Sequence, residues 1–163
     1  MAGEKALILC LGNELMKDDG VGLRAGRILA EKGYNVLEVG TDIFLLQNHY
    51  KGEGRLIIID AILSDELRPG EIIHLQGREI FEKLKAEIRS AHFMGAVEGL
   101  MLLMKLDERL AGAEVHFVGV ATKEIDLGME LSEEVKRAVP KVVELVEKLA
   151  GTQTFIYSPA NRG

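Results

Sequence analysis

The stretch KALILCLGNELMKDDGVG, residues 5–22, sets the fold that the rest of the sequence has to match. Residues 5–11 form a nearly continuous apolar run, which is typical of a strand buried on both faces of a parallel sheet. The run stops at Gly12, and residues 20–32 then place apolar side chains at helical spacing. A buried strand that leads through a loop into a helix is the opening unit of an α/β fold.

The same alternation of strand and helix continues along the chain. The other predicted strands cover 34–39, 55–60, 71–76 and 114–121, and the other predicted helices cover 41–50, 78–88, 93–110 and 132–150. Residues 71–76 alternate in polarity after a turn at Pro69-Gly70, so we expect an antiparallel strand at the sheet edge. The order of elements predicts a three-layer α/β/α sandwich with a mostly parallel sheet.

We expect a single α/β domain over residues 1–150, because the 163-residue chain has no repeat, no low-complexity linker and no break in composition before its end. Residues 151–163 are interpreted as a loosely held C-terminal tail. Within the last helix, Pro140 should introduce a kink. Thr41 or Asp42 should cap the short helix that follows the second strand.

Composition excludes several classes of function. The net charge is −6, and no Lys/Arg run carries interleaved aromatics, so nucleic acid is not an expected partner. No apolar stretch approaches the roughly 18 residues that a membrane span needs. Cys10 is the single cysteine, and the N-terminal residues do not resemble a signal peptide. We therefore expect a cytoplasmic protein with no internal disulfide.

Polar side chains follow the predicted strands at the edge where ligands bind in parallel sheets, outside the carboxyl ends. Asp18 and Asp19 lie in the loop after the first strand, and Asp60 ends the third. His92 lies just before the 93–110 helix. Three loops are thus predicted to bring carboxylates and an imidazole together.

A phosphate cradle does not suit the first loop. GNELMKDDGVG is neither GxGxxG nor a P-loop, and a phosphate at the following helix would meet Asp18 and Asp19. Oxygen and nitrogen ligands suit a divalent cation instead, with positions left open for water or substrate. The ligand types alone do not separate nickel from zinc, cobalt or manganese.

Structural roles compete with the functional ones at these positions. At least one of Asp18 and Asp19 is explained as well by a purely structural role as a helix cap. His92, considered by itself, can equally be a histidine of the cap region or of the core. His74 and His116 lie within strands and are interpreted as structural. Cys10 is in a buried strand with no activating base, so an inert thiol is expected.

The segment LGNELMKDDGVG resembles the G-N-x-x-x-x-D-[DE]-G-x-G signature of the endopeptidases that mature nickel–iron hydrogenases. The resemblance continues in order over roughly residues 5–150. Its further segments are LEVGTD (37–42), LIIIDAI (56–62), PGEII (69–73), SAHFMG (90–95), VGVAT (118–122) and LGMELSEEV (127–135).

The resemblance implies an activity and a partner. Enzymes of this family remove a C-terminal extension from the hydrogenase large-subunit precursor after nickel insertion, so the implied class is a hydrolase, an aspartate- or metal-type endopeptidase. Carried over to this sequence, the metal-contacting and catalytic residues are Asp19, Asp60 and His92. The nickel would come with the substrate, although another divalent ion bound by the protein itself is an open alternative.

The family pattern also assigns supporting residues. Glu38, Gly40 and Thr41 correspond to a D-G-G-T segment and are assigned to substrate binding, with Val39 in place of a glycine. Thr122-Lys123 stands where relatives often carry Pro-Glu, a second possible change in specificity. The residues that shape the first loop are Gly12, Asn13, Asp18, Gly20 and Gly22, with Asp18 as a helix cap or a support for the ligands.

Two other functions stay open at this point. A non-catalytic divalent-metal-binding maturation chaperone on the same fold would bind metal and partner without cleavage. A nucleotide- or flavin-binding domain would share the fold, but the acidic first loop argues against it.

Overall fold

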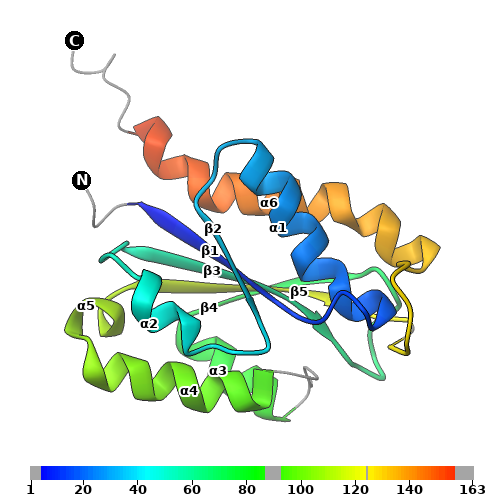
Figure 1. The fold of residues 1–163 in the computed structure, drawn as a ribbon, viewed down its shortest axis with the longest axis horizontal. Coiled ribbons are helices and arrows are strands. Elements are labelled where there is room, and N and C mark those ends of the chain that lie inside the picture. The colour runs from blue at the N-terminus through cyan, green and yellow to red at the C-terminus, as the bar shows by residue number, and fades with distance from the viewer. Residues whose placement is uncertain (1–4, 87–92, 124, 157–163) are drawn as a thin grey trace.

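The computed structural model describes residues 5–86, 93–123 and 125–156, which form one five-stranded sheet in the order β2-β1-β3-β5-β4 (Figure 1). The strands are β1 (Ala6–Leu11), β2 (Val36–Gly40), β3 (Arg55–Ile62), β4 (Ile72–Gln76) and β5 (Glu114–Ala121). Neighbouring strands are parallel except β4, which pairs antiparallel with β5 at the edge. The predicted sheet and its antiparallel edge strand are confirmed.

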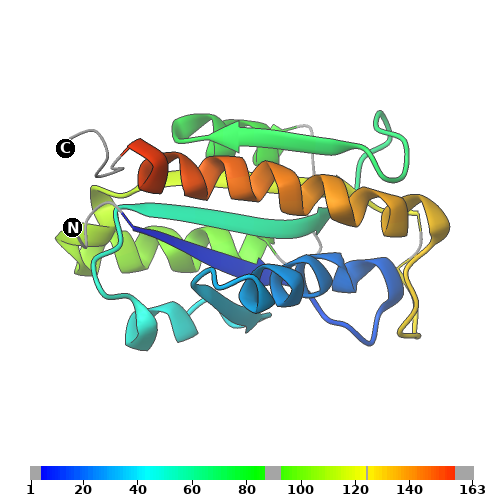
Figure 2. The same cartoon turned by 90° about the horizontal axis from the view of Figure 1, so that it is seen from above.

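Helices cover both faces of the sheet and make the three predicted layers (Figures 1 and 2). The helices are η2 (Lys17–Gly20), α1 (Val21–Glu31), α2 (Leu45–His49), α3 (Arg78–Ala86), α4 (Phe93–Leu106), α5 (Glu108–Ala111) and α6 (Glu133–Ile156). One face carries α1 and α6, and the other carries α2 to α5. No helix among the described residues is long and apolar enough to cross a membrane.

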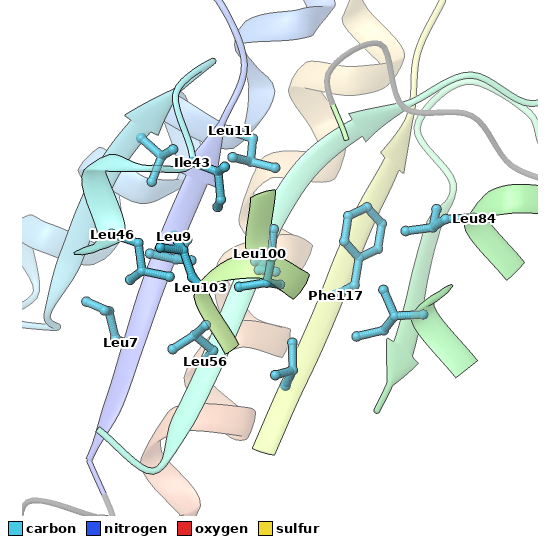
Figure 3. Packing of buried hydrophobic residues seen from close by; sticks show 14 of the residues in the cluster. Leu7, Leu9, Leu11, Ile43, Leu46, Leu56, Leu84, Leu100, Leu103 and Phe117 are labelled. Atoms are coloured by element: carbon cyan, nitrogen blue, oxygen red, sulfur yellow. The ribbon is translucent and has the colours of Figure 1, made fainter. Parts of the chain in front are cut away.

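Side chains of β3 alternate between two hydrophobic cores, and this alternation orients Asp60. Ile57 and Ile59 join the core under α1 and α6. Ile58 and Ile62 join the core on the α4 face, part of which is drawn in Figure 3. Because successive strand residues point to opposite faces, Asp60 lies on the α4 face.

Three helix predictions need correction. The predicted 93–110 helix is interrupted at Asp107, whose carboxylate accepts a hydrogen bond from the Arg109 backbone N–H and caps α5. The short second helix begins only at Leu45, because Asp42 instead closes the preceding turn by accepting from the Phe44 backbone N–H. The last helix passes Pro140 and continues to Ile156, beyond the predicted end at 150.

Candidate active site at the carboxyl edge of the sheet

The loop after β1 folds back on itself, so that it closes on Asp19. Gly12 has φ +125°, and a Cβ there would clash with the Asp19 carbonyl oxygen. The Gly12 N–H donates to the Gly40 carbonyl at 2.9 Å, which fixes the loop to the end of β2. The Asn13 N–H donates to Asp19 Oδ2 at 2.9 Å, so the Asp19 carboxylate is held from within its own loop. Gly12 and Asn13 thus hold the loop in the conformation that encloses Asp19.

The start of α1 brings Asp19 toward the end of β3. A Cβ on Gly22 would lie 2.7 Å from the carbonyl oxygens of both Leu11 and Ile59, so the first turn of α1 sits directly on β1 and β3. Asp19 is in η2, which packs against β3, and its side chain is buried. Asp60 directly follows Ile59, is fully buried, and accepts from the Ala61 N–H at 2.8 Å. The structure thus places both predicted carboxylates at one edge of the sheet.

Asp18 has a different set of partners. Its carboxylate accepts from the backbone N–H of Lys123 at 2.8 Å, and from the N–H and hydroxyl of Ser132 at 2.7 and 2.9 Å. Ser132 immediately precedes α6. The residue before α1 is Gly20, which offers no side-chain cap. Asp18 therefore supports the start of α6, more than a hundred residues away, and does not cap its own helix.

The third predicted ligand, His92, lies outside the described residues. It immediately precedes Phe93, where α4 begins, and α4 covers the face on which Asp60 lies. Within residues 5–86, 93–123 and 125–156, no group of three His, Cys, Asp or Glu side chains is placed to hold a metal ion. The carboxylates of Asp19 and Asp60, which lie at the same edge of the sheet, have the chemistry that divalent cations accept.

Glu38, assigned to substrate binding, is engaged by Arg27 of α1. The guanidinium donates to both Glu38 oxygens, at 3.1 and 3.2 Å, and to both oxygens of Glu14, at 2.8 and 3.2 Å. These contacts with Arg27 hold the pKa of Glu14 below its ordinary value. Glu38 thus lies on the α1 face, opposite to Asp60, while Gly40 and Thr41 lie at the end of β2. Substrate binding by Glu38, Gly40 and Thr41 stays a prediction.

Cys10 is an inert core thiol, as expected. Burial and the nearby Glu38 carboxylate raise its pKa to about 12. Its sulfur occupies the space that a Cβ on Gly26 would need. The thiol is therefore part of the packing between β1 and α1.

Comparisons with known proteins identify the family of this chain. Residues 23–149 match the family described as hydrogenase maturation protease (HycI). The chain belongs to this family.

Its relatives cover most of the chain. It is 60% identical to protein FrxA of Pyrococcus furiosus over 131 residues, 80% of this chain and 94% of that protein. The [NiFe] hydrogenase maturation protease HybD from Thermococcus kodakarensis superposes with a TM-score of 0.88 at 75% identity, over 90% of this chain and 99% of that one. The hydrogenase maturating endopeptidase HybD from E. coli superposes with a TM-score of 0.72 at 26% identity, over 87% and 89% of the two chains.

For a maturation protease, the carboxylates of Asp19 and Asp60 offer two kinds of chemistry. Carboxylate oxygens can bind a divalent cation, and a carboxylate can accept a proton from an attacking water. Sequence reasoning missed the long-range contacts that fix this edge, which are made by Lys123, Gly128 and Ser132. No local sequence pattern marks them, because their partners lie in the first loop.

Proposed function

We propose that this protein is the cytoplasmic endopeptidase that removes the C-terminal extension of a nickel–iron hydrogenase large-subunit precursor after nickel insertion. One observation carries the proposal. In a chain of the hydrogenase maturation protease family, the Asp19 and Asp60 carboxylates are buried at one edge of the sheet. Buried carboxylates cost stability, so their presence at a ligand-binding edge favours a functional role.

In this proposal, nickel is part of the substrate. Asp19, Asp60 and His92 engage the nickel that the precursor already carries, and this contact positions the scissile peptide. One carboxylate then accepts a proton from the water that attacks the peptide carbonyl. A divalent ion resident in the protein and held by the same three residues is the alternative, and it would supply Lewis-acid polarisation of the carbonyl.

The test compares two forms of one substrate. Purified protein is incubated with the nickel-loaded precursor and with the same precursor lacking nickel, and the products are read by intact mass. Asp19→Asn, Asp60→Asn and His92→Ala are run beside wild type, with Asp65→Asn as a control on an exposed loop acid. The proposal expects loss of a C-terminal peptide from the nickel-loaded form alone, and only with wild type and the control.

The other outcomes separate the alternatives. Cleavage of both precursor forms would support the protease activity but contradict recognition of the nickel. Inhibition by a chelator would then point to a divalent ion resident in the protein. Unchanged cleavage by all three site variants would show that the chemistry lies elsewhere. Metal-dependent binding of the precursor without any cleavage would replace the protease with the maturation chaperone.

A further inference from the structure

Two loops that are distant in sequence are joined into one unit beside the candidate site. We call residues 15–17 and 126–130 the loop pair. The Lys17 N–H donates to the Gly128 carbonyl at 2.7 Å, and the Gly128 N–H donates to the Leu15 carbonyl at 2.8 Å. Met16 and Gly128 therefore form a parallel bridge outside the main sheet. Figure 2 shows the two segments side by side at the carboxyl edge.

The loop pair has a fixed register and a fixed base. Gly128 has φ +148°, and a Cβ there would lie 3.1 and 3.2 Å from side-chain carbons of Lys17. At the base, the Asp18 carboxylate binds Lys123 and Ser132, which flank the second loop. The backbone bridge and the buried Asp18 carboxylate together attach the loop pair firmly to the rest of the domain.

Its outer surface is apolar. Leu15 is 51% exposed, Leu127 is 77% exposed and Met129 is 62% exposed. A single exposed leucine needs no explanation, but three large apolar side chains on a short bridged projection are unusual for a surface that meets only water. The acidic residues Asp126 and Glu130 adjoin Leu127 and Met129 in sequence, in a chain with a net charge of −6. This composition fits a partner that offers an apolar hollow with a basic rim.

We propose that the loop pair is the surface on which the folded body of the hydrogenase large-subunit precursor docks. The inference rests on the proposed function. Lys17 of the loop pair is followed directly by Asp18 and Asp19, so the patch is continuous with the candidate site. A folded protein that delivers a peptide segment to Asp19 must lie against this edge of the sheet. There it would contact the exposed side chains of Leu15, Leu127 and Met129.

A second exposed leucine supplies a matched control. Leu106 is 67% exposed at the end of α4, close to α5. Figure 1 shows this end of α4 on the side where β1 begins, opposite to the carboxyl edge. Replacing Leu106 removes an exposed leucine comparable to Leu127 without touching the loop pair.

The experiment measures steady-state processing of the nickel-loaded precursor. Wild type, the double variant Leu127→Ser/Met129→Ser and Leu106→Ser are compared, after circular dichroism has shown that all three are folded. The docking role predicts a KM raised about tenfold in the double variant, with kcat within about twofold, because the docking contact stabilises the bound substrate and the transition state equally. Leu106→Ser should match wild type.

A direct binding measurement separates docking from chemistry. The same substitutions are placed in an Asp60→Asn background, and the Kd for the precursor is measured by interferometry at low and high salt. The double variant should lose about tenfold in affinity, and the affinity of the protein without loop-pair substitutions should fall with salt if the partner's rim is basic.

The failures of the two proposals are distinguishable. Processing by wild type with an unchanged KM in the double variant overturns the docking surface and leaves the protease intact. An equal rise in KM for Leu106→Ser also overturns it, since the effect would not belong to the loop pair. If wild type cleaves neither precursor form, the proposed function fails, and the docking proposal falls with it.

Discussion

The two ends of the central sheet both bury ionisable groups, but they hold them in different ways. At the end where β3 and β5 begin, His116 is buried between two side-chain partners. Its Nδ1 lies 2.8 Å from Nε2 of His74, and its Nε2 lies 2.5 Å from Oε2 of Glu114. Arg55 Nε lies 3.0 Å from the same Glu114 oxygen. Burial alone would raise the pKa of Glu114, but these contacts with His116 and Arg55 lower it on balance.

At the carboxyl end, backbone N–H groups are among the partners of each carboxylate. Asp18, Asp19 and Asp60 accept hydrogen bonds from the N–H groups of Lys123, Asn13 and Ala61, respectively. Backbone amides orient a carboxylate without cancelling its charge, whereas an ionised side-chain partner neutralises it. The beginning of the sheet is therefore built as an acid–base network of side chains, whereas backbone N–H groups orient the carboxylates at the carboxyl end. Substitutions at either end test this difference between the two ends of the sheet.

The largest expected effect is on activity at Asp60. Asp60→Asn keeps the shape and an acceptor oxygen for the Ala61 N–H, but it removes the charge. We expect precursor processing to fall at least about 100-fold, while the free energy of unfolding changes by less than about 1 kcal/mol, because the amide keeps the volume of the carboxylate and its hydrogen bond from Ala61. Activity assays and urea denaturation measure the two quantities.

Asp19→Asn should behave in the same way as Asp60→Asn. A large loss of stability in either variant, comparable to the loss of activity, would mean that the carboxylate is structural and that the contrast between the two ends fails.

Asp18 should show the opposite pattern. Asp18→Ala removes the acceptor for three hydrogen bonds from Lys123 and Ser132, so we expect a loss of about 3 kcal/mol in the free energy of unfolding. Ser132→Ala removes only the hydroxyl bond and should cost about 1 kcal/mol. Urea denaturation of the two variants checks the order. Equal losses would contradict the assignment of Asp18 as the link between the first loop and α6.

The sequence was sufficient for the sheet and for the edge at which its carboxylates meet. Continuous apolar runs such as residues 55–60 identify parallel strands, and the carboxyl-end rule then places Asp19 and Asp60 together. Helix boundaries were less predictable. The apolar spacing of residues 93–110 continues past Asp107, but the local hydrogen bond from Arg109 to that side chain interrupts the helix.

The support of the site could not be predicted, because its contacts are long-range. Asp18 binds residues 105 and 114 positions away, and Gly128 pairs with Met16 across a similar distance. Periodicity and capping patterns report only neighbours in sequence. The burial of Asp18 is a tertiary property, and its role became visible only when Lys123 and Ser132 were placed around it.

Gly22 tests the close packing that brings Asp19 to β3. Gly22→Ala would place a Cβ 2.7 Å from two carbonyl oxygens of β1 and β3, so we expect a loss of about 2 kcal/mol in the free energy of unfolding together with reduced processing. Gly33 is the matched control, because it has φ +98° but a Cβ there would meet no atom within 4 Å. Gly33→Ala should cost about 1 kcal/mol through backbone strain alone and leave processing unchanged.

The smallest effect concerns pH and the opposite end of the sheet. Burial, together with the neighbouring His116, lowers the pKa of His74, against a weaker opposing influence of Glu79. As the pH falls, His74 of the unfolded chain binds a proton near pH 6.5, at a higher pH than His74 of the folded protein does. His74 therefore does not change the free energy of unfolding above about pH 6.5. Below that value, the free energy of unfolding falls as the pH drops toward the lower pKa of His74 in the folded state.

Urea denaturation at pH 7.5, 6.5 and 5.5 measures this slope. His74→Gln should flatten the slope, because the titrating ring is removed while a side-chain N–H donor for His116 is kept. His49→Gln is the control, since that ring lies on α2 with its Nδ1 2.9 Å from the Leu45 carbonyl, away from the histidine pair. An unchanged slope in His74→Gln would show that the network at the beginning of the sheet does not titrate in this range, and that its acid–base pairing is as insensitive to pH as an apolar core.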